Sequence, residues 1–353
     1  MDFISYFIGS EVGDEVGDAP ADAPNDEEDR AEEEVSDEEE RVARALITPD
    51  VLAALTVDMG EEEEVQLNVL MAGGANQRVL ARKIDENLHR KLVSSLQDSV
   101  RDQARIAGLC LPRTSDYLNC YPNRKLGIHL KSSEWCAVVK YRLGVPLYPA
   151  DRRICPACGN QEDARADHAL SCGSGGERIQ RHNGICSAIH NLAVAGGLAP
   201  VREARYLLPN GRKPGDVMIQ FAGDGMLDLA LDISIVASLK PSMLEQCVER
   251  PEAVAESGYQ RKIRSMGNQP QDHSFQFVPV VASCFGAWHP AAITQIKKLI
   301  RAKCTRLGLD EAKTTAEEFR TLSVYLQRGN GRILINRDIQ YGEEPQTDLI
   351  DNM

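Results

Sequence analysis

Three cysteines and a histidine lie close together near the middle of this 353-residue chain. Cys155 and Cys158 are followed by His168 and Cys172, with the spacing C-x2-C-x9-H-x3-C. Zinc prefers four soft or borderline ligands at the corners of a tetrahedron, and a C-x2-C turn presents two thiolates to one ion. The spacing therefore predicts a structural zinc site with no open position for catalysis. The alternative is three buried free cysteines beside a surface histidine.

Acidic residues farther along the chain could form a second metal site. Asp216 begins one expected strand and Asp232 interrupts another, LDLALDISIV, with a Gly-Asp-Gly turn between them. Two carboxylates side by side across a hairpin repel each other unless a cation lies between them. Mg²⁺ or Mn²⁺ bound with a substrate phosphate would resolve that repulsion. Glu203 could supply a third acid, and Lys262 could orient water or stabilise the phosphate. For each acid alone, a solvated carboxylate at a strand end is the alternative.

Two groups of basic side chains could contact nucleic-acid phosphates. One group begins the helix that follows the cysteine cluster, and the other lies on a basic amphipathic helix near the end of the chain. The residues are Arg178, Arg181, His182, Lys297, Lys298 and Arg301. Cations of this kind often follow a nucleic-acid backbone. The alternatives are a solvated helix start and lysine stems that pack along the core with their charges in water.

Apolar periodicity predicts the elements that position these residues. Repeats every four residues predict helices, whereas alternating or β-branched runs predict strands. The expected helices are 84–100, 133–141, 177–195, 252–266, 291–307 and 315–328, and the expected strands are 201–208, 217–219, 227–236 and 275–283. From residue 177 the order is α-β-β-β-α-β-α, which predicts an α/β fold with a mixed sheet.

The net charge of −13 is concentrated near the start of the chain. Residues 11–41 carry 16 acids and two arginines, so the remainder is close to neutral and does not exclude a nucleic-acid partner. This run has few large apolar side chains and is expected to be disordered, as a solvated spacer or an interaction arm. The expected regions are an acidic segment 1–76, a helical subdomain 77–145, a zinc knuckle 146–176, a catalytic core 177–308, and a C-terminal helix and tail 309–353.

Neither a membrane span nor a secretory signal is expected from the sequence. No uninterrupted apolar run reaches about 18 residues, and the first residues lack a basic start and a long apolar stretch. The ten cysteines are too dilute and irregular for a small disulfide framework. We therefore expect a soluble protein of a reducing, intracellular compartment with no membrane partner.

Taken together, residues 77–337 resemble the C-terminal region of reverse-transcriptase polyproteins from non-LTR retrotransposons. The resemblance rests on the cysteine–histidine spacing, Arg181-His182-Asn183, Lys213-Pro214-x-Asp216, Asp232, LGIHL (126–130), YQRK (259–262), GAW (286–288) and LQRGN (326–330). In that family a CCHC zinc knuckle precedes a restriction-like endonuclease of the PD-(D/E)XK fold. The resemblance implies that Asp216 and Asp232 bind the catalytic metal and that Lys262 is the lysine displaced onto the next helix. Ser234 stands where a plain Asp-x-Lys motif has lysine, and Gly215 is inserted in the Pro-Asp motif.

Two functions follow from the resemblance. The first is a Mg²⁺- or Mn²⁺-dependent DNA endonuclease in the nucleus, whose nick supplies a 3′-hydroxyl for target-primed reverse transcription. The second is a catalytically inactive, domesticated module that binds DNA or RNA through the knuckle and the basic helix. Binding of Mg²⁺ separates the two, and a protein-interaction scaffold built on the acidic segment is a weaker third class. The chain lacks a Tyr/Phe-Ala-Asp-Asp motif and is not expected to be the polymerase itself.

Overall fold

The computed structural model describes residues 77–149, 154–205, 208 and 211–339, so the predicted acidic segment 1–76 lies outside the described residues. The chain divides into two compact units, with helix α5 (Gln77–Ser95) in one and the chain from Ser99 onward in the other. The single helix expected across 84–100 is therefore wrong. The first helix ends at Ser95, and a second helix, α6 (Val100–Leu109), begins after Ser99, whose side chain caps it by accepting the backbone N–H of Asp102.

A four-stranded mixed sheet forms the centre of the larger unit. Its strands are β1 (Pro200–Arg202), β2 (Val217–Ile219), β3 (Asp228–Val236) and β4 (Phe275–Ser283), in that spatial order. β2 pairs antiparallel with β1 and β3, whereas β3 and β4 are parallel along their whole length. The predicted α/β class with a mixed sheet is confirmed.

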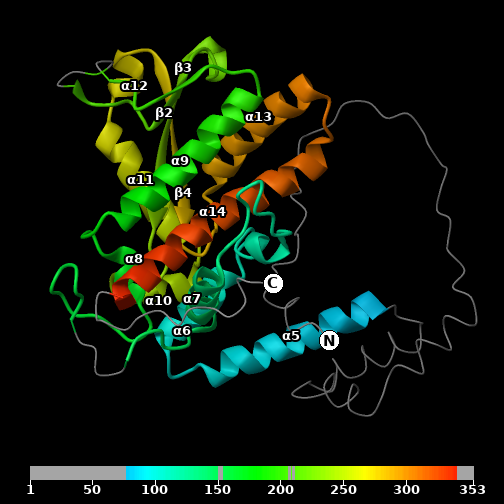
Figure 1. Cartoon of the computed structure of the whole chain (residues 1–353), viewed down its shortest axis with the longest axis vertical. Coiled ribbons are helices and arrows are strands. Elements are labelled where there is room, and N and C mark those ends of the chain that lie inside the picture. Colours follow the sequence, from blue (N-terminus) through cyan, green and yellow to red (C-terminus); the bar gives the residue numbers. More distant parts are fainter. Residues whose placement is uncertain (1–76, 150–153, 206–207, 209–210, 340–353) are drawn as a thin grey trace, which may run out of the picture. The chain divides into compact units, whose positions relative to one another are not determined.

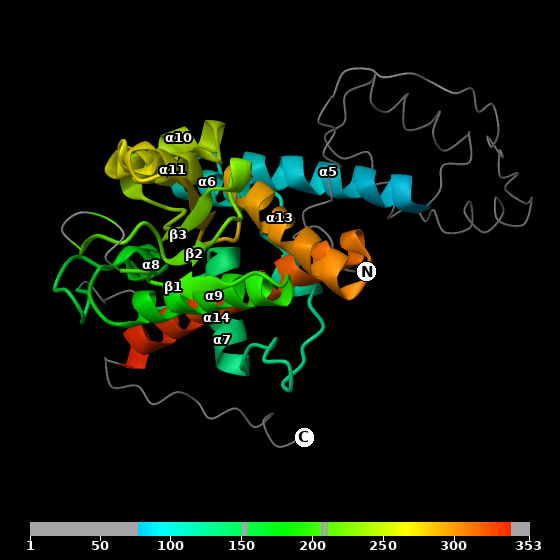
Figure 2. The same cartoon turned by 90° about the horizontal axis from the view of Figure 1, so that it is seen from above.

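The parallel pair requires a crossover, because its two strands run in the same direction. The crossover consists of α10 (Leu244–Glu249), α11 (Ala253–Met266) and α12 (Gln269–Asp272). In Figure 2 the strands lie between α11 on one side and α9 (Glu177–Ala195) on the other. This arrangement places the expected lysine helix and the expected basic helix start on opposite faces of the sheet.

Alternate residues of β3 face the two helical layers. Leu229, Leu231 and Ile233 are buried in one core cluster with apolar residues of α9, α13 (Pro290–Leu307) and α14 (Glu311–Ile339). Val236 belongs to a second cluster, with Val254 of α11. Because both faces are covered, the strand is apolar on both, which explains its nearly continuous apolar sequence.

The second core cluster also joins the segments that precede α9. It contains apolar side chains from α6, α7 (Ser132–Leu143), α8 (Asp167–Ser171) and α14. Figure 1 shows α14 running past α7 and α9 toward α8. The predicted regions from Ser99 onward thus share one core instead of forming separate units. None of the described helices is long and apolar enough to cross a membrane.

Two elements differ in length from those expected. α14 continues beyond residue 328 through Gly329 and Gly331, although glycine normally weakens a helix. A Cβ at Gly331 would lie 2.9 Å from the carbonyl oxygen of Glu134 on α7, so the bare backbone allows the two helices to approach closely. β1 ends at Arg202, short of 208, because Glu203 adopts a left-handed φ of 51°.

We predict that Gly258→Ala destabilises the fold by about 1–3 kcal/mol. A Cβ at Gly258 on α11 would lie 2.9 Å from Val236 Cγ1 and 3.0 Å from Val281 Cγ1, and both valines are buried. The matched control is Gly184→Ala on α9, where a Cβ would meet nothing within 4 Å. There alanine should stabilise by about 0.5–1 kcal/mol through its higher helix propensity. Urea unfolding measures both, and equal shifts would contradict the prediction.

Candidate functional site

The four residues predicted to bind zinc come together as a compact cluster. Their ligand atoms all lie within 4.8 Å of one another. The Cys155 and Cys172 sulfurs are 3.9 Å apart, and Cys158 Sγ lies 3.2 Å from His168 Nε2. Ligand atoms around a tetrahedral zinc are roughly 3.3–3.8 Å apart, given zinc–ligand bonds of about 2.0–2.3 Å. The Cys3His cluster could therefore hold a metal such as zinc.

A carboxylate shapes the loop that carries His168. Asp163 accepts the backbone N–H groups of Arg165, Asp167 and His168 at 2.9–3.2 Å, which satisfies the free donors at the start of α8. Arg101 on α6 then binds both carboxylate oxygens of Asp167, at 2.7 and 2.8 Å. These bonds attach the short helix to the rest of the unit independently of a metal.

Arg178, predicted as a phosphate contact, instead supports this cluster. Its guanidinium donates to the carbonyl oxygens of Ser171 and Cys172 at 3.1 and 3.2 Å, at the end of α8. Arg337, from the far end of α14, donates to the carbonyl oxygen of Ser174. Both arginines use their donors to position the segment that holds the last cysteine.

The cysteine thiols of the cluster differ in their ionisation. Burial raises the pKa of Cys155, whereas the backbone N–H of Asn160 and the neighbouring thiols and imidazole lower the pKa of Cys158. Zinc binds thiolates, so metal binding would release protons from this cluster.

The second predicted pair, Asp216 and Asp232, lies at the end of the β2–β3 ladder. Val217 pairs with Leu231, so the two aspartates occupy the next opposed positions. β2 begins at Val217, so its backbone supplies no carbonyl acceptor for the N–H of Ile233 on β3. The side chain of Asp216 takes that place, because its Oδ2 atom accepts this N–H at 2.8 Å. The carboxylate thus completes the hydrogen bonding of β3 while lying beside Asp232.

One cationic or titratable side chain reaches this pair from each face of the sheet. Lys262 Nζ on α11 lies 2.9 Å from Asp232 Oδ2, and His182 Nε2 on α9 lies 3.3 Å from Asp216 Oδ1. All four side chains are partly buried, with 19–30% of their surface exposed. The site therefore combines two adjacent carboxylates, an ammonium group and an imidazole at one edge of the sheet.

The two carboxylates have opposite pKa shifts. Burial raises the pKa of Asp232 and outweighs the opposing effect of Lys262, and the neighbouring Asp216 adds a smaller contribution in the same direction as burial. Burial also acts on Asp216, but its bonds with His182 and with the N–H of Ile233 outweigh it and lower the pKa. The direction of the Asp232 shift is the one expected for a member of an acid pair, although burial is its main cause.

Glu203 does not join the other acids. Its carboxylate is 46% exposed and lies 2.9 Å from Lys213 Nζ, in an ion pair that lowers its pKa. Only its backbone contacts the site, through a hydrogen bond from its N–H to the carbonyl oxygen of Asp216. β1 ends in a left-handed turn at Glu203. The expectation that Glu203 joins Asp216 and Asp232 as a third acid of the site is therefore wrong.

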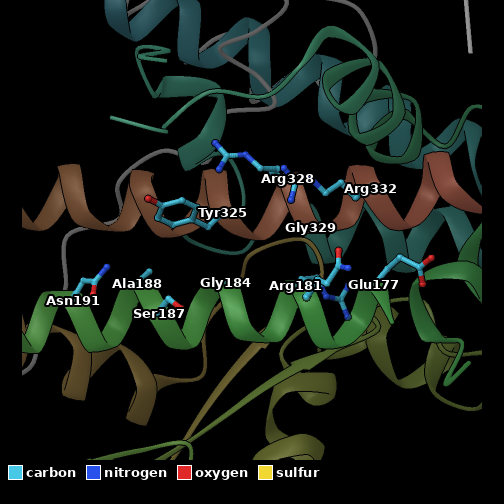
Figure 3. A pocket seen from close by; sticks show the side chains of 11 residues that line it. Glu177, Arg181, Gly184, Ser187, Ala188, Asn191, Tyr325, Arg328, Gly329 and Arg332 are labelled. Atoms are coloured by element: carbon cyan, nitrogen blue, oxygen red, sulfur yellow. The ribbon is translucent and has the colours of Figure 1, made fainter. Parts of the chain in front are cut away.

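Arg181 is buried instead of facing a nucleic acid. It is 3% exposed, and its guanidinium donates to Asn330 Oδ1 on α14 at 2.7 Å. Burial lowers its pKa to about 10, so the side chain stays charged at neutral pH. Arg181 lines a pocket of about 250 Å³ together with Arg328 and Arg332. Figure 3 shows these side chains between α9 and α14. These two also have partners inside the chain: Arg328 bonds the carbonyl oxygens of residues 127 and 129, and Arg332 pairs with Glu134.

Two cations of the predicted basic helix are also paired within the chain. Lys298 Nζ lies 2.8 Å from the carboxylate of Asp224, and Arg301 binds Glu311 at 2.9 Å. Lys297 is partly buried on the same helix, α13. The prediction that this helix offers free charges to phosphates is therefore not supported for Lys298 and Arg301, because nearby acids already neutralise them.

Sequence reasoning missed the role of Cys186. Its sulfur lies 3.3 Å from His182 Nε2 and, with Asp216, forms a second group of atoms within 4.8 Å that could hold a metal. The sequence contained a signal for this contact, because His182 and Cys186 are four residues apart and residues at that spacing share one face of a helix. His182, expected to contact phosphate, is directed instead at the carboxylate pair.

No family model and no curated protein matches this chain in sequence comparisons.

We predict that the purified chain contains zinc at the Cys3His cluster and that Cys158→Ser abolishes binding there. The serine hydroxyl replaces a thiolate ligand, and the loop that the metal stabilises should become sensitive to protease near residues 146–180. Elemental analysis and limited proteolysis measure the two effects. Cys136→Ser, an exposed cysteine outside the cluster, is the control. Correctly folded protein with no zinc would contradict the prediction.

We predict that the stability gained by Asp232→Asn increases with pH. The pKa of Asp232 is raised above 3.8 in the folded chain, so the folded state binds more protons than the unfolded state over that interval. The contribution of Asp232 to the stability of the native chain therefore falls as pH rises from about 3.8 through the raised pKa, and asparagine removes this fall. Urea unfolding of both chains in magnesium-free buffer at several pH values measures the difference. A difference independent of pH would contradict the assignment.

Proposed function

We propose that this chain is a metal-dependent DNA endonuclease of the restriction-like PD-(D/E)XK type, with a CCHC zinc knuckle, derived from or belonging to a retroelement. The observation that carries the proposal is the meeting of Asp216, Asp232 and Lys262 at one edge of the sheet. Asp216 immediately precedes β2, Asp232 lies on β3 and Lys262 on α11, and the resemblance implied the same three.

The order of elements supports the proposal. The chain runs from α9 through three antiparallel strands and the crossover with α11 to the parallel strand β4, which is the α-β-β-β-α-β order that apolar periodicity predicted. The Cys3His cluster precedes this core and is attached to it by Arg178 and Arg337. A nuclease with this plan would act on DNA in the nucleus.

The donor set fits a hard divalent ion. Asp216 and Asp232 offer carboxylate oxygens from adjacent positions of the β2–β3 ladder, and two neighbouring carboxylates repel each other unless a cation compensates them. Mg²⁺ or Mn²⁺ held there supplies Lewis-acid polarisation of water and phosphate.

The chain's own residues have distinct tasks in this reaction. Lys262 would stabilise the charge that develops on the phosphate oxygens, and His182 would hold Asp216 in its orientation. Hydrolysis adds one water to the phosphodiester. A bond forms from the water oxygen to phosphorus, the P–O3′ bond breaks, and the departing oxygen takes a proton. The products are a 3′-hydroxyl and a 5′-phosphate.

A specific observation favours the second candidate, an inactive nucleic-acid-binding module. Lys262 already pairs with Asp232, while His182 and the N–H of Ile233 bind Asp216. This network compensates both carboxylates without an ion. In an inactive module the ion pair would be purely structural, and Mg²⁺ would not stabilise the fold.

We predict that the chain nicks supercoiled plasmid in Mg²⁺ or Mn²⁺ and that Asp232→Asn lowers the nicking rate by at least about 1,000-fold. Such a loss corresponds to about 4 kcal/mol of transition-state stabilisation. Asp228→Asn, four residues earlier on β3, is the matched control, because asparagine can still accept the N–H of Phe221.

Thermal unfolding with and without Mg²⁺ completes the test. Magnesium should raise the melting temperature of the native chain and have a smaller effect on Asp232→Asn. Equal plasmid nicking by the native and Asp232→Asn chains would refute the site assignment. Absence of both nicking and magnesium stabilisation would favour the inactive module.

A further inference from the structure

A thiol and an imidazole on α9 lie next to the carboxylate of Asp216, the residue that precedes β2. His182 Nε2 lies 3.3 Å from both Cys186 Sγ and Asp216 Oδ1, and the three atoms are mutually within 4.8 Å. We propose that His182, Cys186 and Asp216 form a second, inhibitory zinc site. This site shares Asp216 with the proposed magnesium site, so the inhibitory part of the proposal rests on the proposed function.

The spacing of the three atoms fits tetrahedral zinc. Bonds of about 2.0 Å to nitrogen and oxygen and 2.3 Å to sulfur place ligand atoms roughly 3.3–3.6 Å apart. The sulfur-to-nitrogen distance here, 3.3 Å, is close to the 3.2 Å between Cys158 and His168 in the Cys3His cluster. Three protein ligands leave a fourth position for water or a substrate oxygen, as in zinc sites that are not purely structural.

The helix fixes two of these ligands before any metal arrives. His182 and Cys186 are four residues apart on α9, which is helical from Glu177 to Ala195. Asp216 is held by the N–H of Ile233 through its other oxygen, Oδ2, so Oδ1 remains directed at His182. A preformed set of ligands reduces the ordering required on binding.

The sulfur gives this site a selectivity that the carboxylate pair lacks. Thiolate and imidazole bind zinc well, whereas Mg²⁺ prefers oxygen ligands. Magnesium would therefore occupy the carboxylates without engaging Cys186.

Zinc at this site would inhibit nicking because both sites need Asp216. An Asp216 oxygen bound to zinc between α9 and β2 no longer serves a magnesium ion placed between Asp216 and Asp232. The inhibition would thus remove one ligand of the catalytic ion without blocking the DNA surface.

The test measures zinc directly and needs no enzymatic activity. The full chain is equilibrated with excess zinc, desalted, and analysed for metal content. The native chain should hold one more equivalent than Cys186→Ala. The matched control is Cys247→Ala, which also removes a buried thiol and should keep both equivalents.

Two aspartate variants make the test independent of the cysteine variants. Asp216→Asn should also lose one equivalent, whereas Asp232→Asn should retain both because Asp232 is not a ligand of this site. Equal zinc content in the native, Cys186→Ala and Asp216→Asn chains would overturn the proposal. If Cys186→Ala does not fold, the comparison between the two aspartate variants decides the matter alone.

The inhibitory role is tested by measuring the rate of plasmid nicking in saturating Mg²⁺ with and without added zinc. The native chain should lose at least about tenfold in rate, and Cys186→Ala should be insensitive at the same zinc concentration. Equal inhibition of both chains would overturn the inhibitory role. If no chain nicks DNA, the proposed function and the inhibitory role fail, while the zinc contents still decide whether the site exists.

Discussion

Close packing of α14 against its neighbours is the contact on which the larger unit depends. This single helix bonds to segments from much of the chain: Asn330 binds Arg181 on α9, Gln327 binds the carbonyl oxygens after β4, and Arg337 binds the loop of the last cluster cysteine. Such approach is possible because Gly329 and Gly331 present bare backbone where other residues would collide. The two glycines lower the intrinsic helix propensity of α14, and in return the helix approaches its neighbours closely enough to form these hydrogen bonds.

The periodicity of the sequence was enough to predict the layers of the fold. The helix 177–195 and the strands 217–219 and 275–283 match the structure, since their apolar residues repeat with the period of the element that buries them. Breaks and ends were less predictable. The Gly-Asn-Gly sequence after Arg328 reads as a helix end, yet the gain from close packing with α7 and α9 exceeds the local cost.

The candidate site shows the same division between local and distant information. The spacing of four residues over 18 positions predicted a cluster that could hold a metal, and a short connection predicted that Asp216 and Asp232 lie opposite each other. Partners of charged side chains could not be predicted in this way. Arg178 and Arg181 lie beside one another on α9, but they bind the knuckle and α14, because those segments approach only in the folded chain. Sequence shows which residues carry charge, and tertiary packing decides whether water, a ligand or the chain itself balances it.

The position of α14 at the end of the described chain has a consequence for folding during synthesis. Its bonds connect residues that are far apart in sequence: 149 residues separate Arg181 from Asn330, and 163 separate Ser174 from Arg337. While the ribosome makes the first two thirds of the protein, Arg181 has no partner for its guanidinium, and the sheet lacks β4. Contacts of such long range also form slowly. The four residues of the Cys3His cluster all lie between residues 155 and 172, so a metal held there would stabilise this segment before α14 is made.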